Sequence, residues 1–250
     1  MPMSSSSWAM DGYGRCRAMR PRSVSRWVFA WGLMLVAALV IGVVTRISYG
    51  DVSAHPETMD GLPYEVAPYS QERFEQYAKG MGDASTAQAL SNAELVARVQ
   101  KKASSIYRYK AFASEMRVME VLRGDDCLQG VSIDVYEPVS LRDWGGTRCL
   151  VAVDAYQFGS TPMREDEEYV LFLNRAPHNR VVGDAWTLVV SPFAKIAADG
   201  NPTCMVHEGV GESMELRELK DADMVAESDR DMEAYLVGCE DVLRSLDVER

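Results

Sequence analysis

Imidazole is the side-chain group that most often serves as a base or a metal ligand near neutral pH, and this sequence has only three histidines. They are His55, His178 and His207, and none has a partner at the spacing of a metal site or a catalytic triad. Nucleophile-elbow, zinc-protease and phosphate-loop motifs do not occur either. We therefore expect no catalytic residue, no metal ligand and no cofactor.

Carboxylates are the other groups that could do chemistry. Residues 165–168 form an acidic run, and calcium accepts oxygen ligands of this kind. Consecutive side chains before a strand point in alternating directions, so we expect a solvated turn that discourages edge pairing. Asp221 and Asp223 are expected to serve the approach and cap of a final helix. Residues 123–125, Arg-Gly-Asp, match an integrin-binding tripeptide, but their place in a turn after a strand favours a structural role.

Five cysteines bear on the redox environment. Cys16 precedes a long apolar segment, whereas Cys127, Cys149, Cys204 and Cys239 follow it. An even number of cysteines in an oxidising compartment allows one or two disulfides with three complete pairings, and we expect at least one. Cys239 is expected to be left out because it lies on the apolar face of a helix, and buried free thiols are the alternative. No Cys-x-x-Cys spacing supports zinc or thioredoxin-like chemistry.

The elements that must position these residues begin with the apolar segment. No charged residue occurs between Arg26 and Arg46, and a helix over Trp27–Thr45 would span roughly 28 Å, close to the thickness of a hydrocarbon core. Five arginines precede the segment and one follows it closely, so the positive-inside rule places the N-terminus in the cytoplasm. We predict a single-pass protein of the cell membrane that contacts the lipid bilayer through Trp27–Thr45, with its C-terminal domain outside. A signal peptide cleaved after Ala54 is the alternative.

Net charge separates the two sides of this segment. The whole chain carries −11, and residues 1–50 hold six basic residues and one acid, a balance of +5. Residues 51–250 therefore carry −16. A domain this acidic repels nucleic acid and anionic lipid headgroups, so neither is expected as a partner of that domain.

Local signals divide the chain into five parts. A short helix is expected from Ser70 to Lys79, ended by Gly80. Residues 91–94, Ser-Asn-Ala-Glu, form a capping box that predicts a second helix running to about Lys102. The five parts are a disordered basic cytoplasmic tail (1–26), a transmembrane helix (27–45), an extracytoplasmic stalk with a short helix (46–90), a β-barrel domain with a leading helix (91–210) and a C-terminal helical segment packed on the barrel (211–250).

After residue 105 the apolar period changes to two, which predicts short strands. Residues 169–173 are apolar on both faces and should form a central strand. Apolar residues from Met232 to Leu246 recur at three and four, which predicts an amphipathic helix packed on the sheet of that strand. The other predicted strands are 107–113, continued by 116–122 across a bend, then 131–136, 150–153 and 186–190, with weaker candidates at 193–197 and 205–207.

Three stretches carry a resemblance, namely Met116–Gly124, Val131–Tyr136 and Met163–Leu173. They resemble uncharacterised extracytoplasmic domains of single-span membrane proteins from Gram-positive bacteria, and they are distantly similar to the OB-like barrels of netrin and tissue-inhibitor modules. Such domains usually have Lys-Gly where Arg123-Gly124 stands and glycine where Asp166 stands. Tissue inhibitors act through an N-terminal cysteine that has no counterpart here. The resemblance covers about residues 105–175 and implies a fold but no activity.

Together these features predict an α+β protein. An N-terminal transmembrane helix is followed by a small antiparallel, OB-like β-barrel with flanking helices, including the amphipathic C-terminal helix. We expect a non-catalytic, membrane-anchored module that binds an unknown extracytoplasmic protein or envelope component. One alternative is a carboxylate-dependent hydrolase, in which acidic side chains would converge in a cleft with raised pKa values. Another is a membrane-tethered sensor or inhibitor.

Overall fold

The computed structural model describes residues 24–48, 59, 61–80, 90–103, 105–108, 111–144, 146–177, 184–208 and 213–248. The chain forms two compact units, Met1–Gly50 and Asp51–Arg250. Several predicted features lie outside the described residues. They are the basic tail up to residue 23 with Cys16, the possible cleavage position Ala54, and the histidines His55 and His178.

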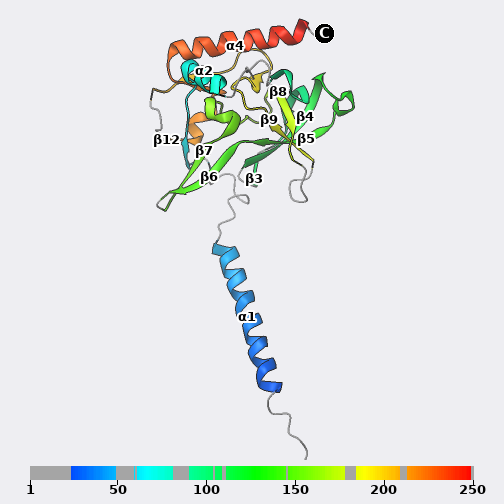
Figure 1. Cartoon of the computed structure of the whole chain (residues 1–250), viewed down its shortest axis with the longest axis vertical. Helices are drawn as coiled ribbons and strands as arrows, with labels where there is room; N and C mark the ends of the chain where they lie inside the picture. Colours follow the sequence, from blue (N-terminus) through cyan, green and yellow to red (C-terminus); the bar gives the residue numbers. More distant parts are fainter. Residues whose placement is uncertain are drawn as a thin grey trace, which may run out of the picture. The chain divides into compact units, whose positions relative to one another are not determined.

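The described part of the first unit is a single helix, α1 (Val24–Ser48), which covers the whole apolar segment (Figure 1). Every side chain from residue 28 to residue 43 is exposed. These side chains include Phe29, Trp31 and Leu35, so the helix presents apolar groups around its circumference. The prediction of a helix here is confirmed. In the described portion of the chain, no helix meets the combined length and hydropathy needed to cross a membrane.

The second unit is built on a closed barrel of five strands (Figure 1). β2 pairs with β4 and β8, β4 pairs with β5, and β9 closes the ring by pairing with both β5 and β8. The β5–β9 pair is parallel and the others are antiparallel, so the predicted all-antiparallel barrel is wrong at this pair. Five strands cannot alternate in direction around a closed ring, and one neighbouring pair must be parallel. The strands are β2 (Leu95–Lys101), β4 (Ala111–Arg123), β5 (Ser132–Glu137), β8 (Glu168–Arg175) and β9 (Ala185–Leu188).

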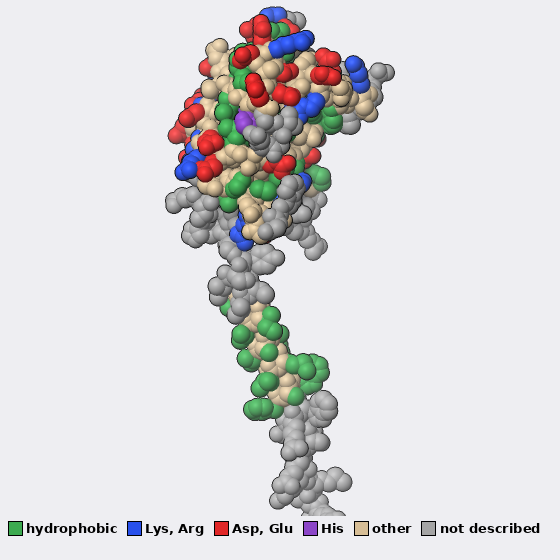
Figure 2. Space-filling view, turned by 90° about the vertical axis from the view of Figure 1, so that its left-hand side faces the viewer, with side chains coloured by type: hydrophobic (Ala, Val, Ile, Leu, Met, Phe, Trp, Pro, Cys, Tyr) green, Lys and Arg blue, Asp and Glu red, His purple; other side chains and the backbone are tan. Residues whose placement is uncertain are grey.

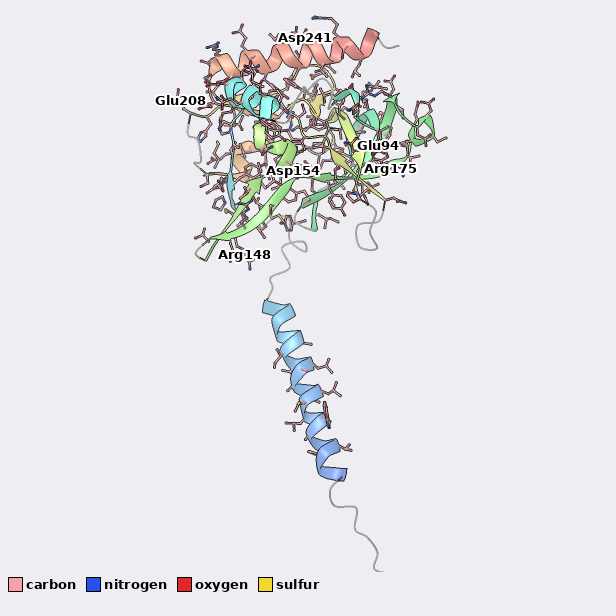
Figure 3. All side chains as sticks on the ribbon, in the orientation of Figure 1. Glu94, Arg148, Asp154, Arg175, Glu208 and Asp241 are labelled. Carbon is pink, nitrogen blue, oxygen red and sulfur yellow. The ribbon has the colours of Figure 1, made fainter. Side chains whose placement is uncertain are left out.

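The helix predicted after residue 91 is wrong, because residues 95–101 form β2. Leu95, Val96 and Val99 are fully buried, and both faces of the strand are covered over residues 95–97, whereas Arg98 on one face is exposed. Apolar residues at such spacing fit a doubly buried strand as well as one helix face. Glu94, the carboxylate of the predicted capping box, does not cap a helix. Its Oε1 accepts a hydrogen bond from the backbone N–H of Arg175 at 3.3 Å. Figure 3 labels Glu94 and Arg175 near this end of the barrel.

The strand predicted over residues 107–113 is confirmed only in part, because the described residues of this range belong to two different strands. β3 (Ile106–Arg108) pairs back onto the start of β4, with Ile106 opposite Ala113. Two short paired strands and one long strand show the same alternation, so the pattern could not tell them apart. By contrast, the strands predicted at 116–122, 131–136, 169–173 and 186–190 are confirmed as parts of β4, β5, β8 and β9, and β8 is buried along 169–173.

Two smaller sheets and the 3₁₀ helices η3, η4 and η5 also occur among the described residues of the unit. A four-stranded sheet has the order β12-β1-β7-β6, and its β6–β7 hairpin projects from the barrel with Arg148 near the tip (Figure 3). β7 and β11 confirm the strands predicted near 150–153 and 205–207, and β10, which pairs with β8, confirms the one near 193–197. The remaining bounds are β1 (Pro63–Glu65), β6 (Val139–Trp144), β7 (Thr147–Ala152), β10 (Lys195–Ala197), β11 (Cys204–Val206), β12 (Ser213–Glu215), β13 (Met224–Ala226), η3 (Asp126–Leu128), η4 (Asp154–Phe158) and η5 (Leu216–Leu219).

Two helices lie on one side of the barrel unit (Figure 1). α2 (Gln71–Gly80) confirms the short helix, and α4 (Asp229–Val248) confirms the amphipathic C-terminal helix. α4 contacts β11, β13 and α2, rather than docking chiefly on β8 as expected. Tyr235 and Cys239 are fully buried on its inner face, whereas Leu236 is half-buried and Asp241 points outward (Figure 3). The two-stranded β11–β13 sheet supplies this docking surface.

A pocket beside a buried polar network

The described part of the chain contains a pocket with a volume of about 630 Å³. Its walls come from the end of β2, the start of β4, the loop before β8, and η5 with the residues that follow it. Six lining residues are apolar and six are charged, three of each sign. The apolar ones are Met59, Phe112, Pro162, Met163, Leu216 and Leu219, and the charged ones are Lys101, Arg164, Glu165, Glu167, Lys220 and Asp221.

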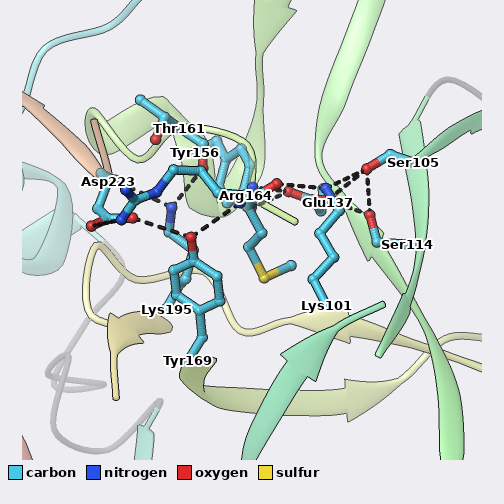
Figure 4. Close-up of polar contacts among 11 residues, drawn as sticks. Lys101, Ser105, Ser114, Glu137, Tyr156, Thr161, Arg164, Tyr169, Lys195 and Asp223 are labelled. Carbon is cyan, nitrogen blue, oxygen red and sulfur yellow. Dashed lines mark hydrogen bonds and ion pairs between the residues drawn. The ribbon is translucent and has the colours of Figure 1, made fainter. Parts of the chain in front are cut away.

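A fully buried carboxylate, Glu137, lies next to this pocket (Figure 4). Tyr156 donates its hydroxyl to Oε2 at 2.9 Å, and the backbone N–H of Met163 donates to the same oxygen at 2.6 Å. Ser105 donates to Oε1 at 3.2 Å, and Ser114 makes a short hydrogen bond to that oxygen. Both carboxylate oxygens are therefore engaged by protein donors, as a buried anion requires.

Lys101 supplies the positive charge that faces Glu137, at 3.5 Å from Nζ to Oε1. Its Nζ also donates to Ser105 Oγ at 2.7 Å and to the backbone carbonyl of Met163. An ammonium has three donors, so these three acceptors use all of them. Burial alone would raise the pKa of Glu137, but Lys101 and the hydrogen-bond donors hold the pKa of that carboxyl below its usual value.

A second buried carboxylate, Asp223, anchors the other end of the network (Figure 4). Arg164 Nη2 pairs with Oδ2 at 2.9 Å, and Tyr169 donates its hydroxyl to Oδ1 at 3.2 Å. The backbone N–H of Thr203 also donates to Oδ2, at 2.9 Å. Asp223 therefore ties β8 to the segment before β11, and it does not cap α4 as predicted. Ser228 performs that role by accepting from the backbone N–H of Asp231 at 3.2 Å.

Lys195, in β10, lies between the two carboxylates but pairs with neither side chain in the described hydrogen bonds and ion pairs. Its Nζ donates to the carbonyls of Thr161 at 2.6 Å and Asp223 at 3.2 Å. The same nitrogen lies 5.6 Å from the ring centroid of Tyr156 and 5.4 Å from that of Tyr169. Burial lowers the pKa of Lys195 to about 8, although Asp223 and Glu137 act in the opposite direction.

Sequence reasoning missed most of this network. The sequence did contain a signal for Glu137. This residue follows Ile133 and Val135 at every second position of β5, so alternation predicts that it faces inward. A charged residue at such a position must find a buried partner. Lys195 lies in an apolar stretch and gives a similar signal, but its partners come from distant segments. Among the described candidates, Asp223 belongs to the network, while Asp221 lies in the pocket wall.

The other candidates lie in separate places. Residues 165–168 begin as an exposed turn, as predicted, and Glu165 and Glu167 line the pocket rim. Within the described residues, no three His, Cys, Asp or Glu side chains form a group that could hold a metal ion. Residues 123–125 play a structural role, since Asp125 caps η3 by accepting from the backbone N–H of Cys127 at 3.0 Å. His207 follows β11 and does not line the pocket.

The expected disulfide does not form among the described cysteines. Cys127, Cys149, Cys204 and Cys239 are all free thiols. Cys127 is exposed and Cys239 is fully buried, whereas the other two are half-buried. Buried thiols pack as small apolar groups, which was the alternative reading of the sequence.

Comparison of the chain with protein-family models, curated proteins and solved structures gives no match. Function must therefore be argued from the pocket, the network and the chain's own sequence.

Proposed function

We propose that this protein is a non-catalytic binding module held at the outer face of a cell membrane by α1. The apolar segment Trp27–Thr45 lies within α1, and its flanking arginines favour a cytoplasmic N-terminus. Exposed apolar side chains around that helix suit a lipid environment better than water. Figure 2 displays acidic side chains over one face of the second unit, which suits a soluble domain that does not bind anionic surfaces.

The barrel supports an OB-like reading of the domain. OB-folds are five-stranded Greek-key barrels that bind ligands with their barrel face and adjoining loops. The ring of β2, β4, β5, β9 and β8 has this number of strands. The resemblance of residues 105–175 to extracytoplasmic and netrin-type barrels agrees with this proposal.

The pocket of about 630 Å³ is the observation that carries the binding role. Ligand sites commonly have volumes of this size, with apolar walls and a few polar groups that set orientation. Here six lining residues are apolar and six are charged. Four of the charged ones form an exposed rim of mixed charge, namely Glu165, Glu167, Lys220 and Asp221. We infer a ligand with an apolar group that enters the pocket and a polar part that meets this rim, such as an extended segment of an envelope protein.

The buried network supports a binding role over a hydrolytic one. A catalytic acid at neutral pH needs a raised pKa, whereas the pKa of Glu137 is lowered. The oxygens of Glu137 and the three donors of Lys101 are also occupied by protein groups. We infer that the network braces the pocket wall and does not react with a ligand.

Two experiments on intact cells test this proposal. First, protease added outside should digest the chain beyond Arg46 and leave an N-terminal tag protected. Cleavage of the tag from outside, or a mature protein that begins at His55, would contradict the anchored topology.

Second, a photo-crosslinking residue in place of Lys220 at the pocket rim should capture a discrete ligand. The same residue in place of Glu240, which is 69% exposed on α4, is the control and should not capture it. Leu216→Trp, which fills the half-buried wall of the pocket, should abolish the capture at Lys220. Equal capture at both positions, or capture that survives pocket filling, would refute binding in the pocket.

A further inference from the structure

The inner face of α4 packs against residues 193–200, which include β10 and precede β11. Tyr235 stacks on Phe193 with 5.6 Å between ring centroids and 7° between ring planes. A side chain at Gly238 would collide with the same ring, because an added Cβ would lie 2.5 Å from it. Further along, Leu243 Cδ1 lies 3.5 Å from where a Cβ on Gly200 would be. The helix is therefore fixed against this segment on both sides of residue 239.

Two cysteines lie on the two elements that approach each other here. Cys239 follows Tyr235 by about one helical turn and is fully buried, while Cys204 is half-buried at the start of β11. α4 contacts β11 directly. Burial raises the pKa of the Tyr235 hydroxyl well above its usual value, and the nearby Cys239 and Cys204 raise this pKa further. The other two cysteines lie on different elements, Cys127 in η3 and Cys149 in β7.

We propose that Cys204 and Cys239 are an oxidisable pair whose disulfide would fasten α4 to β11. The structure holds the reduced form of the pair. This inference selects Cys204 and Cys239 as the linked pair and assigns no bond to Cys127 or Cys149. The bond would close the chain segment that contains β12, η5 and β13, and it would thereby restrict the unfolded chain.

The reaction requires a disulfide oxidant, for which oxidised glutathione is a suitable small molecule. The Cys204 thiolate attacks the oxidant, whose S–S bond breaks and releases one glutathione thiol. The Cys239 thiolate then attacks the Cys204 sulfur of the mixed disulfide and releases the second thiol, so that two protein thiols are oxidised and one oxidant disulfide is reduced. Cys204 should react first because it is the more exposed of the two.

Oxidation should be slow at neutral pH. Burial raises the pKa of Cys204 to about 11 and that of Cys239 to about 12, and the thiolate is the reacting form. The reaction should accelerate between pH 7 and pH 9 as the thiolate fraction grows. Transient opening of α4 would expose Cys239 to the mixed disulfide.

The test uses the full chain in detergent micelles, treated with oxidised glutathione at pH 8.5, alkylated, and mapped by mass spectrometry without reduction. We expect a linked peptide that contains Cys204 and Cys239. The melting temperature should rise by about 5–10 °C and return to its starting value after reduction. Cys204→Ser should lose both the link and the rise, whereas Cys127→Ser, at an exposed position, should keep both.

The wild-type peptide map decides the matter even if a variant folds poorly. Separate alkylation of Cys204 and Cys239 after prolonged oxidation, in protein that keeps its folded thermal transition, would overturn the proposal. A dominant link from either residue to Cys149 or Cys127 would also overturn it. The experiment does not depend on a ligand in the pocket, so it stands apart from the binding role proposed above.

Discussion

The protein buries two lysines in one polar network, and it satisfies them in different ways. Lys101 faces the carboxylate of Glu137 and is 4% exposed. Lys195 is 2% exposed, yet its described partners are two backbone carbonyls and the rings of Tyr156 and Tyr169. A buried charge needs partners, and a carboxylate supplies a full opposite charge where carbonyls and rings supply only partial ones. The two sites should therefore respond differently to mutation and to pH.

Removing each lysine in turn should give the largest difference. Lys101→Met leaves Glu137 buried without its ion-pair partner, and breaking such a pair costs about 3–5 kcal/mol. Lys195→Met removes donors from two carbonyls and should cost about 1–3 kcal/mol. Thermal unfolding of the full chain in micelles measures both, with exposed Lys102→Met as the control. Equal losses from the two substitutions would show that the ion pair has no special role.

Acid should weaken the Glu137 site selectively. The folded pKa of Glu137 lies below the unfolded value, so its contribution is present above the unfolded pKa of about 4.3 and is lost as pH falls through the folded pKa. Glu137→Gln should be less stable than wild type at pH 7 by about 3–5 kcal/mol, because Lys101 loses its counter-charge. The gap between the two proteins should narrow below pH 4 in denaturant titrations. A gap that does not change with pH would contradict a charged Glu137.

Alkali should act on the Lys195 site in the opposite sense. Its folded pKa of about 8 lies below the unfolded value of 10.5, so folding is penalised below pH 8 and the penalty is relieved as pH rises to 10.5. Wild type should therefore gain about 3 kcal/mol relative to Lys195→Met across this interval. Measuring the difference between the two proteins cancels the titration of tyrosines and cysteines. Parallel pH profiles would mean that Lys195 titrates normally.

Single hydroxyl deletions should cost less than breaking the Lys101–Glu137 ion pair. Tyr156→Phe removes a donor to Glu137 and should cost about 1.5–3 kcal/mol, since hydrogen bonds to charged groups are stronger than neutral ones. Tyr169→Phe should cost less, because its bond to Asp223 is longer, at 3.2 Å, and Arg164 still neutralises that carboxylate. Melting temperatures of the two variants compare them directly. A larger loss for Tyr169→Phe would reverse the ranking of the two sites.

The sequence predicted the parts of this protein whose signals are local. The apolar run that forms α1, the alternation of β5, the doubly apolar β8 and the stripe of α4 each follow from a short stretch of residues. The main local error was β2, where one helix face and a strand buried on both faces at its start share an apolar pattern over residues 95–99. Only tertiary cover on both faces distinguishes the two.

Closure of the barrel and assembly of the polar network were decided by tertiary structure. The charged residues of the network come from four separate segments, and the sequence of one segment does not indicate which residues of the others it will contact. They are Lys101, Glu137, Lys195 and Asp223. The sequence could place Glu137 at an inward position, but only the closed ring brings Lys101 to its carboxylate. The same holds for Cys204 and Cys239, whose elements come together because α4 docks on β11. The local sequence pattern determines which side chains are buried, and long-range packing determines which residues those side chains contact.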